Sequence, residues 1–176
     1  MGPLGELLAT DQRQALEFFT LRLKDLSGPA VDREELLYTA SVLAHHALIS
    51  TQADLELSAP ANLSAVFDHF VLDRSLSRDS PMMETAGAQC LVLSGFFEDQ
   101  MRRRHNIHWY AELGAGFFRR AAEHGQSPRK GRLLHAIAGR FETWRQRCAR
   151  LSRDLRDQPY LLSLPRQNQP IKPDSP

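Results

Sequence analysis

Ala86-Gly-Ala-Gln-Cys-Leu-Val-Leu-Ser-Gly-Phe-Phe97 is an almost uninterrupted apolar run near the middle of the sequence. A helix that is apolar on nearly every side has to be buried on nearly every side. We therefore expect a central helix over about residues 81–102, covered by the other helices of the chain. Ser80 as N-cap and Pro81 as the first helical residue mark its predicted start.

Amphipathic segments on both sides of this run predict five further helices, because their apolar residues recur at spacings of three and four. No segment alternates apolar and polar residues as a half-buried strand does. We therefore expect an all-α fold, a single-domain bundle of about six helices over residues 1–158. An extended Pro-rich tail is expected over residues 159–176. The five further helices are predicted at about 10–26, 32–51, 63–72, 107–122 and 127–155.

Capping residues support several of these boundaries. Asp32, followed three positions later by Glu35, resembles a capping box. Asn106 is placed to cap the fifth helix and Gly125 to end it. Residues 1–9 contain glycine and proline, so we expect a frayed terminus there.

Glycines interrupt two of the most apolar helices. Gly87 and Gly95 lie on the predicted central helix, and Gly114 and Gly116 on the next one. Each costs up to about 1 kcal/mol relative to alanine. The latter pair lacks the third glycine and the preceding strand of a phosphate-binding loop. We expect these glycines to let neighbouring helices approach closely.

The clearest periodic signal is a heptad seam over residues 134–155. Its seven apolar residues are separated alternately by three and four positions. Packing within the bundle is the simpler interpretation, and a coiled-coil-like contact in a homodimer is the alternative. The seam consists of Leu134, Ile137, Phe141, Trp144, Cys148, Leu151 and Leu155.

The composition, with 42% hydrophobic and 24% charged residues, is that of a globular protein and not of a disordered one. The apolar runs are too short to cross a bilayer, and the N-terminus lacks the basic and apolar regions of a signal peptide. Cys90 and Cys148 fall on apolar helical stripes, where a reduced thiol behaves as a small hydrophobe. We therefore expect a cytoplasmic protein with no membrane partner and no disulfide.

Residues capable of catalytic or metal chemistry are present but do not form the required patterns. Cys90 and Ser94 lie inside the most apolar helix and not in a nucleophile turn. His105 and His108 flank a predicted helix start, and the Glu-x-x-His pairs of a di-iron bundle are missing. We expect no metal, no cofactor and no catalytic residue, which favours a non-catalytic protein.

Arginine dominates the charge pattern. Residues 1–128 carry 11 basic against 17 acidic residues, whereas residues 129–157 carry nine against three. One interpretation is that the basic last helix lies across acidic neighbours, and the other is that it binds an acidic partner. Arginine suits the second role because its guanidinium holds a carboxylate or phosphate bidentately. The candidate partner-binding residues are Arg102, Arg103, Arg104, Arg119, Arg120, Arg145, Arg150 and Arg153.

Three functional hypotheses arise from these observations. The leading one is a regulator or adaptor that binds an acidic protein partner through the arginines. The second is a small-molecule or cofactor-binding helical protein, which includes an enzyme, with a pocket lined by Phe96, Phe97, His108, Trp109 and Tyr110. The third is nucleic-acid binding by the basic surface, although no recognition helix or aromatic-interleaved basic stretch accompanies it.

The central stretch resembles a group of uncharacterised bacterial helical proteins. The shared pattern is Leu-x-Leu-Ser-Gly-Phe-Phe-Glu, then a basic run, then an aromatic pair followed by glycine. It covers about residues 84–122, and the aromatic pair departs from the group's pattern as Trp-Tyr. The resemblance implies a bacterial, cytoplasmic, helical protein and supplies no activity. The matching residues are Leu91, Leu93, Ser94, Gly95, Phe96, Phe97, Glu98, Arg102, Arg103, Arg104, Trp109, Tyr110, Gly114 and Phe118.

Overall fold

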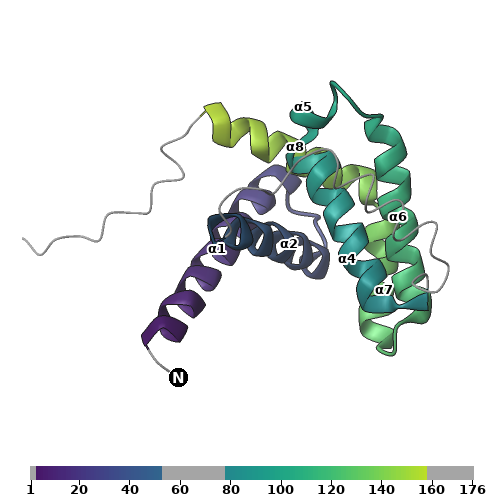
Figure 1. The fold of residues 1–176 in the computed structure, drawn as a ribbon, viewed down its shortest axis with the longest axis horizontal. Coiled ribbons are helices and arrows are strands. Elements are labelled where there is room, and N and C mark those ends of the chain that lie inside the picture. The colour runs from purple at the N-terminus through teal and green to yellow at the C-terminus, as the bar shows by residue number, and fades with distance from the viewer. Residues whose placement is uncertain (1–2, 53–77, 158–176) are drawn as a thin grey trace, which may run out of the picture.

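The computed structural model describes residues 3–52 and 78–157, which form a bundle of helices (Figure 1). No strand occurs within these ranges, so the expected all-α fold is confirmed. The helix predicted over 63–72 and the tail predicted over 159–176 lie outside the described residues. The elements are α1 (Pro3–Ser27), α2 (Arg33–Gln52), α4 (Ser80–Leu91), the π-helical turn η3 (Val92–Phe96), α5 (Glu98–Met101), α6 (Ile107–His124), α7 (Pro128–Gly139) and α8 (Phe141–Asp157).

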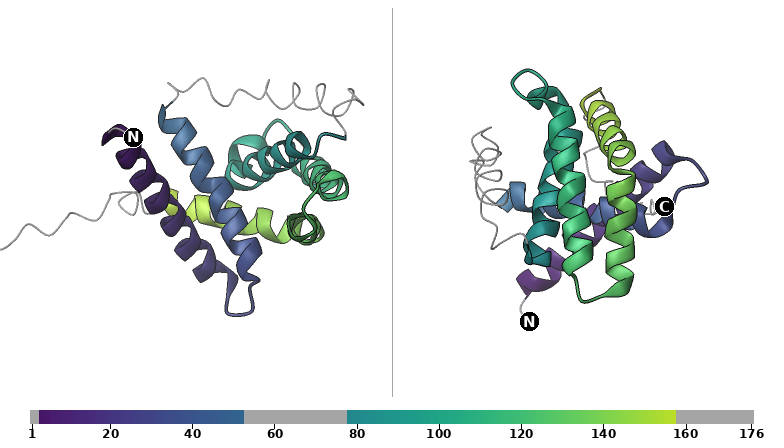
Figure 2. Two further views of the ribbon diagram at one scale, coloured as in Figure 1. Left: turned by 90° about the horizontal axis from the view of Figure 1, so that it is seen from below. Right: turned by 90° about the vertical axis from the view of Figure 1, so that its right-hand side faces the viewer.

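Two groups of helices meet at α8. The first is the hairpin of α1 and α2, which turns at Gly28 with a φ of 77°, a value that favours glycine. The second contains α4, α6 and α7, and Figure 2 shows it lying to one side of the hairpin. Because α8 packs against both α1 and η3, it joins the hairpin to the second group.

The predicted central helix is present, but it is built from α4, η3 and α5 in succession. Its apolar residues are buried as expected, and Ala86, Cys90 and Leu91 are fully inaccessible to solvent. α4 packs mainly against α6, while η3 packs mainly against α8. Successive segments of the apolar run therefore pack against different helices, and the run is largely buried along its length.

Glycines on α4 and α6 allow these helices to approach their neighbours, as predicted. A Cβ atom on Gly87 would lie 3.0 Å from the ring of Phe118, and one on Gly114 would lie 2.5 Å from the ring of Phe141. Gly116 differs, because no described atom beyond its chain neighbours and its own helical backbone lies within 4 Å of its Cβ position. The expectation of a close approach is therefore wrong for Gly116 within the described part of the chain.

The single helix predicted over 127–155 is divided into α7 and α8. Arg140, with φ of −112° and ψ of 23°, leaves the helical conformation between them. The heptad pattern continues across the break, and all seven residues of the seam are buried within the chain. The seam therefore packs internally, and a dimer contact through it would compete with the fold of the single chain.

Most predicted helix caps are found, with two shifts. The side chains of Asn106 and Ser127 cap α6 and α7. The N-cap of α4 is Asp79 and not Ser80, whose hydroxyl instead donates a 2.7 Å hydrogen bond to the Ala121 carbonyl on α6. α1 begins at Pro3, so the frayed start predicted over 1–9 is wrong for residues 3–9, since proline is well tolerated in the first helical turn, and residues 1–2 lie outside the described residues.

Candidate functional site

Two buried glutamates contact α8 from different sides. Glu35 on α2 is 2% exposed and Glu98 on α5 is 4% exposed. Burial of a carboxylate is strongly unfavourable unless the charge is paired and hydrogen-bonded. Both glutamates are paired with α8, Glu35 through Trp144 and Glu98 through the next residue, Arg145. α8 is thereby fixed to the hairpin and to the central helix by adjacent residues.

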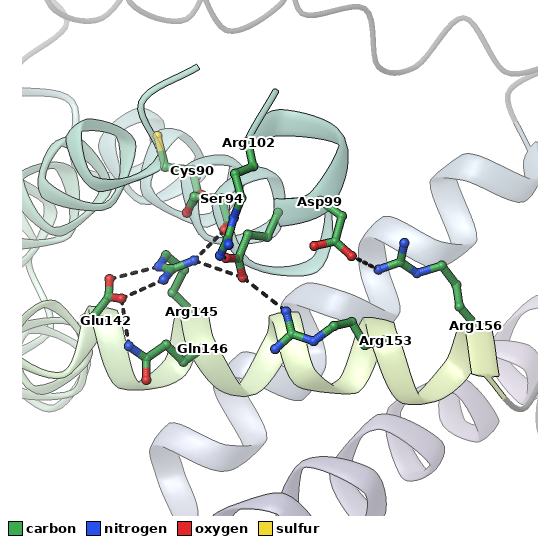
Figure 3. Close-up of polar contacts among 10 residues, drawn as sticks. Cys90, Ser94, Asp99, Arg102, Glu142, Arg145, Gln146, Arg153 and Arg156 are labelled. Carbon is green, nitrogen blue, oxygen red and sulfur yellow. Dashed lines mark hydrogen bonds and ion pairs between the residues drawn. The ribbon is translucent and has the colours of Figure 1, made fainter. Parts of the chain in front are cut away.

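Three arginines surround the carboxylate of Glu98, and all three are labelled in Figure 3. Arg145 Nη1 lies 3.3 Å and Arg153 Nη1 3.7 Å from its Oε2 atom, and Arg102 donates to its Oε1 atom. The Arg145 side chain is only 9% exposed, whereas the side chains of Arg102 and Arg153 are 67% and 47% exposed. One buried carboxylate therefore holds one buried and two solvent-facing guanidinium groups.

The π-helical turn η3 brings Glu98 into this position. The amide of Phe97 donates to the carbonyl of Val92, five residues earlier, at 3.1 Å. One residue more per turn rotates all later residues by about 100° relative to a continuous α-helix. The Ser94 carbonyl within this turn accepts a 3.0 Å hydrogen bond from Arg145 Nη1. Arg145 thus binds both the irregular turn and the glutamate just after it.

Gly95 allows η3 to lie directly on α8. A Cβ atom at this position would lie 3.0 Å from both the Arg145 carbonyl oxygen and Cys148 Cβ. This separation is shorter than real Cβ contacts allow without a shift of the neighbour. Glycine therefore fits here without a shift of α8, and it also lowers the helix propensity of the turn.

Further ion pairs extend the network along α8. Arg145 donates two hydrogen bonds to Glu142, at 2.9 and 2.6 Å, and these bonds lower the pKa of the Glu142 carboxyl. Gln146 donates to the same carboxylate at 2.9 Å. Near the other end of α8, Arg156 pairs with Asp99 on α5. Each end of the network thus pairs an arginine with a partly exposed carboxylate (Figure 3).

Glu35 has a second role that the capping pattern did not reveal. Its amide donates to Asp32 at 3.0 Å, which forms one half of the predicted capping box. Its carboxylate turns inward instead of back to the cap, and it accepts hydrogen bonds from Trp144 Nε1 at 2.8 Å and Arg140 Nε at 2.9 Å. The available signal was Trp144 in the apolar seam, because a buried indole N–H requires an acceptor.

The eight predicted partner-binding arginines do not form one surface. Arg145 is buried, while Arg102 and Arg153 join it around Glu98. Arg119 and Arg120 lie near the end of α6, roughly 20 Å along the helix axis from its start. Five of the eight are exposed and have no ion pair with any residue in 3–52 or 78–157: Arg103, Arg104, Arg119, Arg120 and Arg150.

Four of the five residues proposed to line a pocket are linked by contacts. The Phe96 and Phe97 rings lie 5.4 Å apart, Phe97 packs against the small cluster that contains Tyr110, and the Tyr110 ring lies 4.8 Å from that of Trp109. Phe96 and Phe97 also contact Phe19 and His46, whereas His108 is exposed beside Glu112. Hollows of about 560 and 510 Å³ lie elsewhere, between α4, α6 and α7 and between α1, α2 and α7.

The candidate nucleophiles are held in unreactive environments. Cys90 and Cys148 are free thiols, and burial raises the pKa of each to about 12. Since the thiolate is the nucleophile, neither is activated at neutral pH. Ser94 donates its hydroxyl proton to the Cys90 carbonyl at 2.5 Å. Across residues 3–52 and 78–157, no three histidine, cysteine or acidic side chains are grouped as metal ligands.

None of the helices in the described ranges has the length and apolar character needed to span a membrane. The sequence matches no protein-family model, and comparisons with curated proteins and with solved structures find no match. The resemblance over residues 84–122 therefore adds no functional assignment. The arrangement of side chains around Glu98 is thus the strongest functional feature of the described residues.

Proposed function

We propose that the chain is a non-catalytic adaptor or regulator that binds an acidic segment of a protein partner. The observation that carries this proposal is the convergence of Arg102 and Arg153 on the buried Glu98 carboxylate. A mobile arginine loses about 2 kcal/mol of rotamer entropy when it is fixed, so arginines that are already held bind an anion at lower cost. The binding surface, termed the arginine rim, consists of Arg102, Arg103, Arg104, Arg150 and Arg153.

The local charge supports an acidic partner. Residues 98–104 contain three arginines and two acidic residues, and α8 contains five arginines and three acidic residues. These two segments therefore carry a net charge of +3 by this count. A concentration of positive charge speeds the encounter with an acidic partner and disfavours basic ones.

The unreactive environments of Cys90, Cys148 and Ser94 support a non-catalytic role, because none of these three candidate nucleophiles is activated. The free state of both cysteines supports a reducing compartment, so the proposal includes a cytoplasmic location. Nucleic acid is the competing anionic partner for the same arginines, and the experiment has to separate it from protein.

Affinity capture from the source cell, with nuclease added, tests the proposal. The variant Arg103→Glu/Arg104→Glu reverses two rim arginines that have no internal ion pair among the described residues. The matched control Arg119→Glu/Arg120→Glu makes the same charge change at the other end of α6. We expect a nuclease-resistant protein partner to be lost only with the rim variant, at unchanged helicity. Full retention of that partner by the rim variant would reject the proposal.

A further inference from the structure

The guanidinium groups of Arg102 and Arg153 approach one point from two different helices. Arg102 follows α5 and Arg153 lies on α8, and each contacts Glu98 through one Nη atom. Because these contacts are made to the two oxygens of one carboxylate, Arg102 Nη2 and Arg153 Nη1 are at most about 8 Å apart. The pair is thus held close together, with both side chains about half exposed or more.

Each of these guanidinium groups has unused donors. Arg102 uses Nη2 and Arg153 uses Nη1, and the Nε and second Nη atoms of both have no hydrogen-bond partner within residues 3–52 and 78–157. A guanidinium presents its N–H donors in a planar fork that binds oxyanions bidentately. Two incompletely used forks therefore face solvent beside each other.

The negative charge beneath the pair is already offset. Glu98 also contacts Arg145 at 3.3 Å, so its single charge is shared by a third, buried arginine. Arg103 and Arg104 come directly after Arg102 in the chain and are exposed. An incoming anion therefore meets an excess of positive charge and not the carboxylate alone.

We propose that Arg102 and Arg153 bind a phosphate monoester, an inference that rests on the proposed acidic partner and names its chemistry. A carboxylate offers two oxygens in one plane and a single negative charge. A phosphate monoester offers three acceptor oxygens in a tetrahedral arrangement and a charge between −1 and −2, so it accepts hydrogen bonds from two forks at once. Two arginines from separate helices fit the second geometry.

The phosphate monoester has two sources, a phosphorylated side chain of a protein or a small phosphorylated molecule. Three probes separate them: a short acidic peptide with one phosphoserine, the same peptide with two glutamates in its place, and phenyl phosphate. The variant Arg102→Lys/Arg153→Lys keeps both charges but removes the forks. The matched control is Arg119→Lys/Arg120→Lys, and thermal melting verifies that every variant is folded.

Binding is measured by fluorescence anisotropy of the labelled peptides and by shifts of the arginine Nε–H signals in NMR spectra. We expect the phosphopeptide to bind at least about tenfold more tightly than the glutamate peptide. We expect that preference to disappear in Arg102→Lys/Arg153→Lys and to persist in the control. If the natural ligand is a small phosphorylated molecule, phenyl phosphate should shift the Nε–H signals of Arg102 and Arg153 at concentrations similar to those of the phosphopeptide. If it is a phosphorylated protein, phenyl phosphate should shift them only at much higher concentrations.

Other outcomes overturn the inference in distinguishable ways. If the two peptides bound equally and both lost binding when the charges of the arginine rim were reversed, the phosphate preference would be refuted. The proposal of an acidic protein partner would then still stand. Binding of neither peptide, with no change of the Nε–H signals, would refute the phosphate site. If, in addition, the Arg103→Glu/Arg104→Glu variant kept the protein partner in the affinity capture, the proposed function would be refuted together with the phosphate site.

Discussion

At the residue scale, Thr39 is a clear source of instability in the core. Its side chain is fully buried on α2, and its Oγ1 atom has no hydrogen-bond partner among the described residues. A buried hydroxyl without a partner costs about 1–3 kcal/mol. We expect Thr39→Val to raise the free energy of unfolding by about 1 kcal/mol in urea denaturation. Thr85→Val is the control, because the exposed Thr85 hydroxyl donates to the Pro81 carbonyl and no gain is expected.

Gly95 is the residue at which the packing of η3 on α8 is most sensitive. A methyl group there would lie 3.0 Å from the backbone of α8, and backbone cannot move aside as a side chain can. We expect Gly95→Ala to lower the free energy of unfolding by about 1–3 kcal/mol. Gly139→Ala should be neutral or slightly stabilising, because Gly139 is exposed and a Cβ atom there would meet no described atom beyond its chain neighbours and its own helical backbone. Equal melting temperatures for the two variants would contradict this account.

Sequence reasoning succeeded for residues whose role depends on near neighbours. Asn106 and Ser127 cap helices through amides three positions away, and Gly114 lies at a helix contact. It failed for Glu35 and Glu98, whose partners are distant in sequence. Glu35 follows a predicted helix start, where an acidic residue looks like a cap or dipole partner. Glu98 lies near the end of the predicted central helix, and nothing local indicates that either residue is buried.

At the element scale, the limits of prediction have a physical cause as well. The heptad spacing of apolar residues continues across Arg140, although the backbone leaves the helical conformation at that residue. The apolar spacing therefore does not reveal the helix break. The apolar run from residue 86 to 97 indicates burial but not the additional residue in the π-helical turn. The Ser94 carbonyl of that turn accepts a hydrogen bond from Arg145 on α8, a partner that is distant in sequence.

The element most dependent on Glu98 is α5, a helix of four residues. We expect Glu98→Gln to lower the free energy of unfolding by about 2–4 kcal/mol, because the variant leaves three guanidinium groups without their shared charge. Glu142→Gln is the control, and it should cost less than about 1 kcal/mol since Glu142 is half exposed. Urea denaturation near pH 7 measures both. Similar losses for the two variants would mean that burial of Glu98 is not decisive.

At the scale of the whole molecule, stability should decrease as the solution becomes mildly acidic. His46 packs on the Phe97 ring, and burial, with a smaller effect of the neighbouring His45, lowers the pKa of its imidazole below 6.5. Folded His46 therefore takes up its proton at lower pH than unfolded His46. As pH falls below 6.5 the unfolded chain binds this proton first, so the free energy of unfolding declines until the folded imidazole also becomes protonated.

The corresponding experiment is urea denaturation between pH 7.5 and pH 5, a range chosen around the ordinary histidine pKa of about 6.5. We expect His46→Gln to flatten the decline, and His135→Gln, a change at an exposed position on α7, to leave it unchanged. Glu142 cannot produce the effect, because its pKa is lowered from 4.5, and the stability it contributes is lost only below that value. If the free energy of unfolding of His46→Gln declined as steeply as that of the unaltered protein, groups other than His46 would cause the pH dependence.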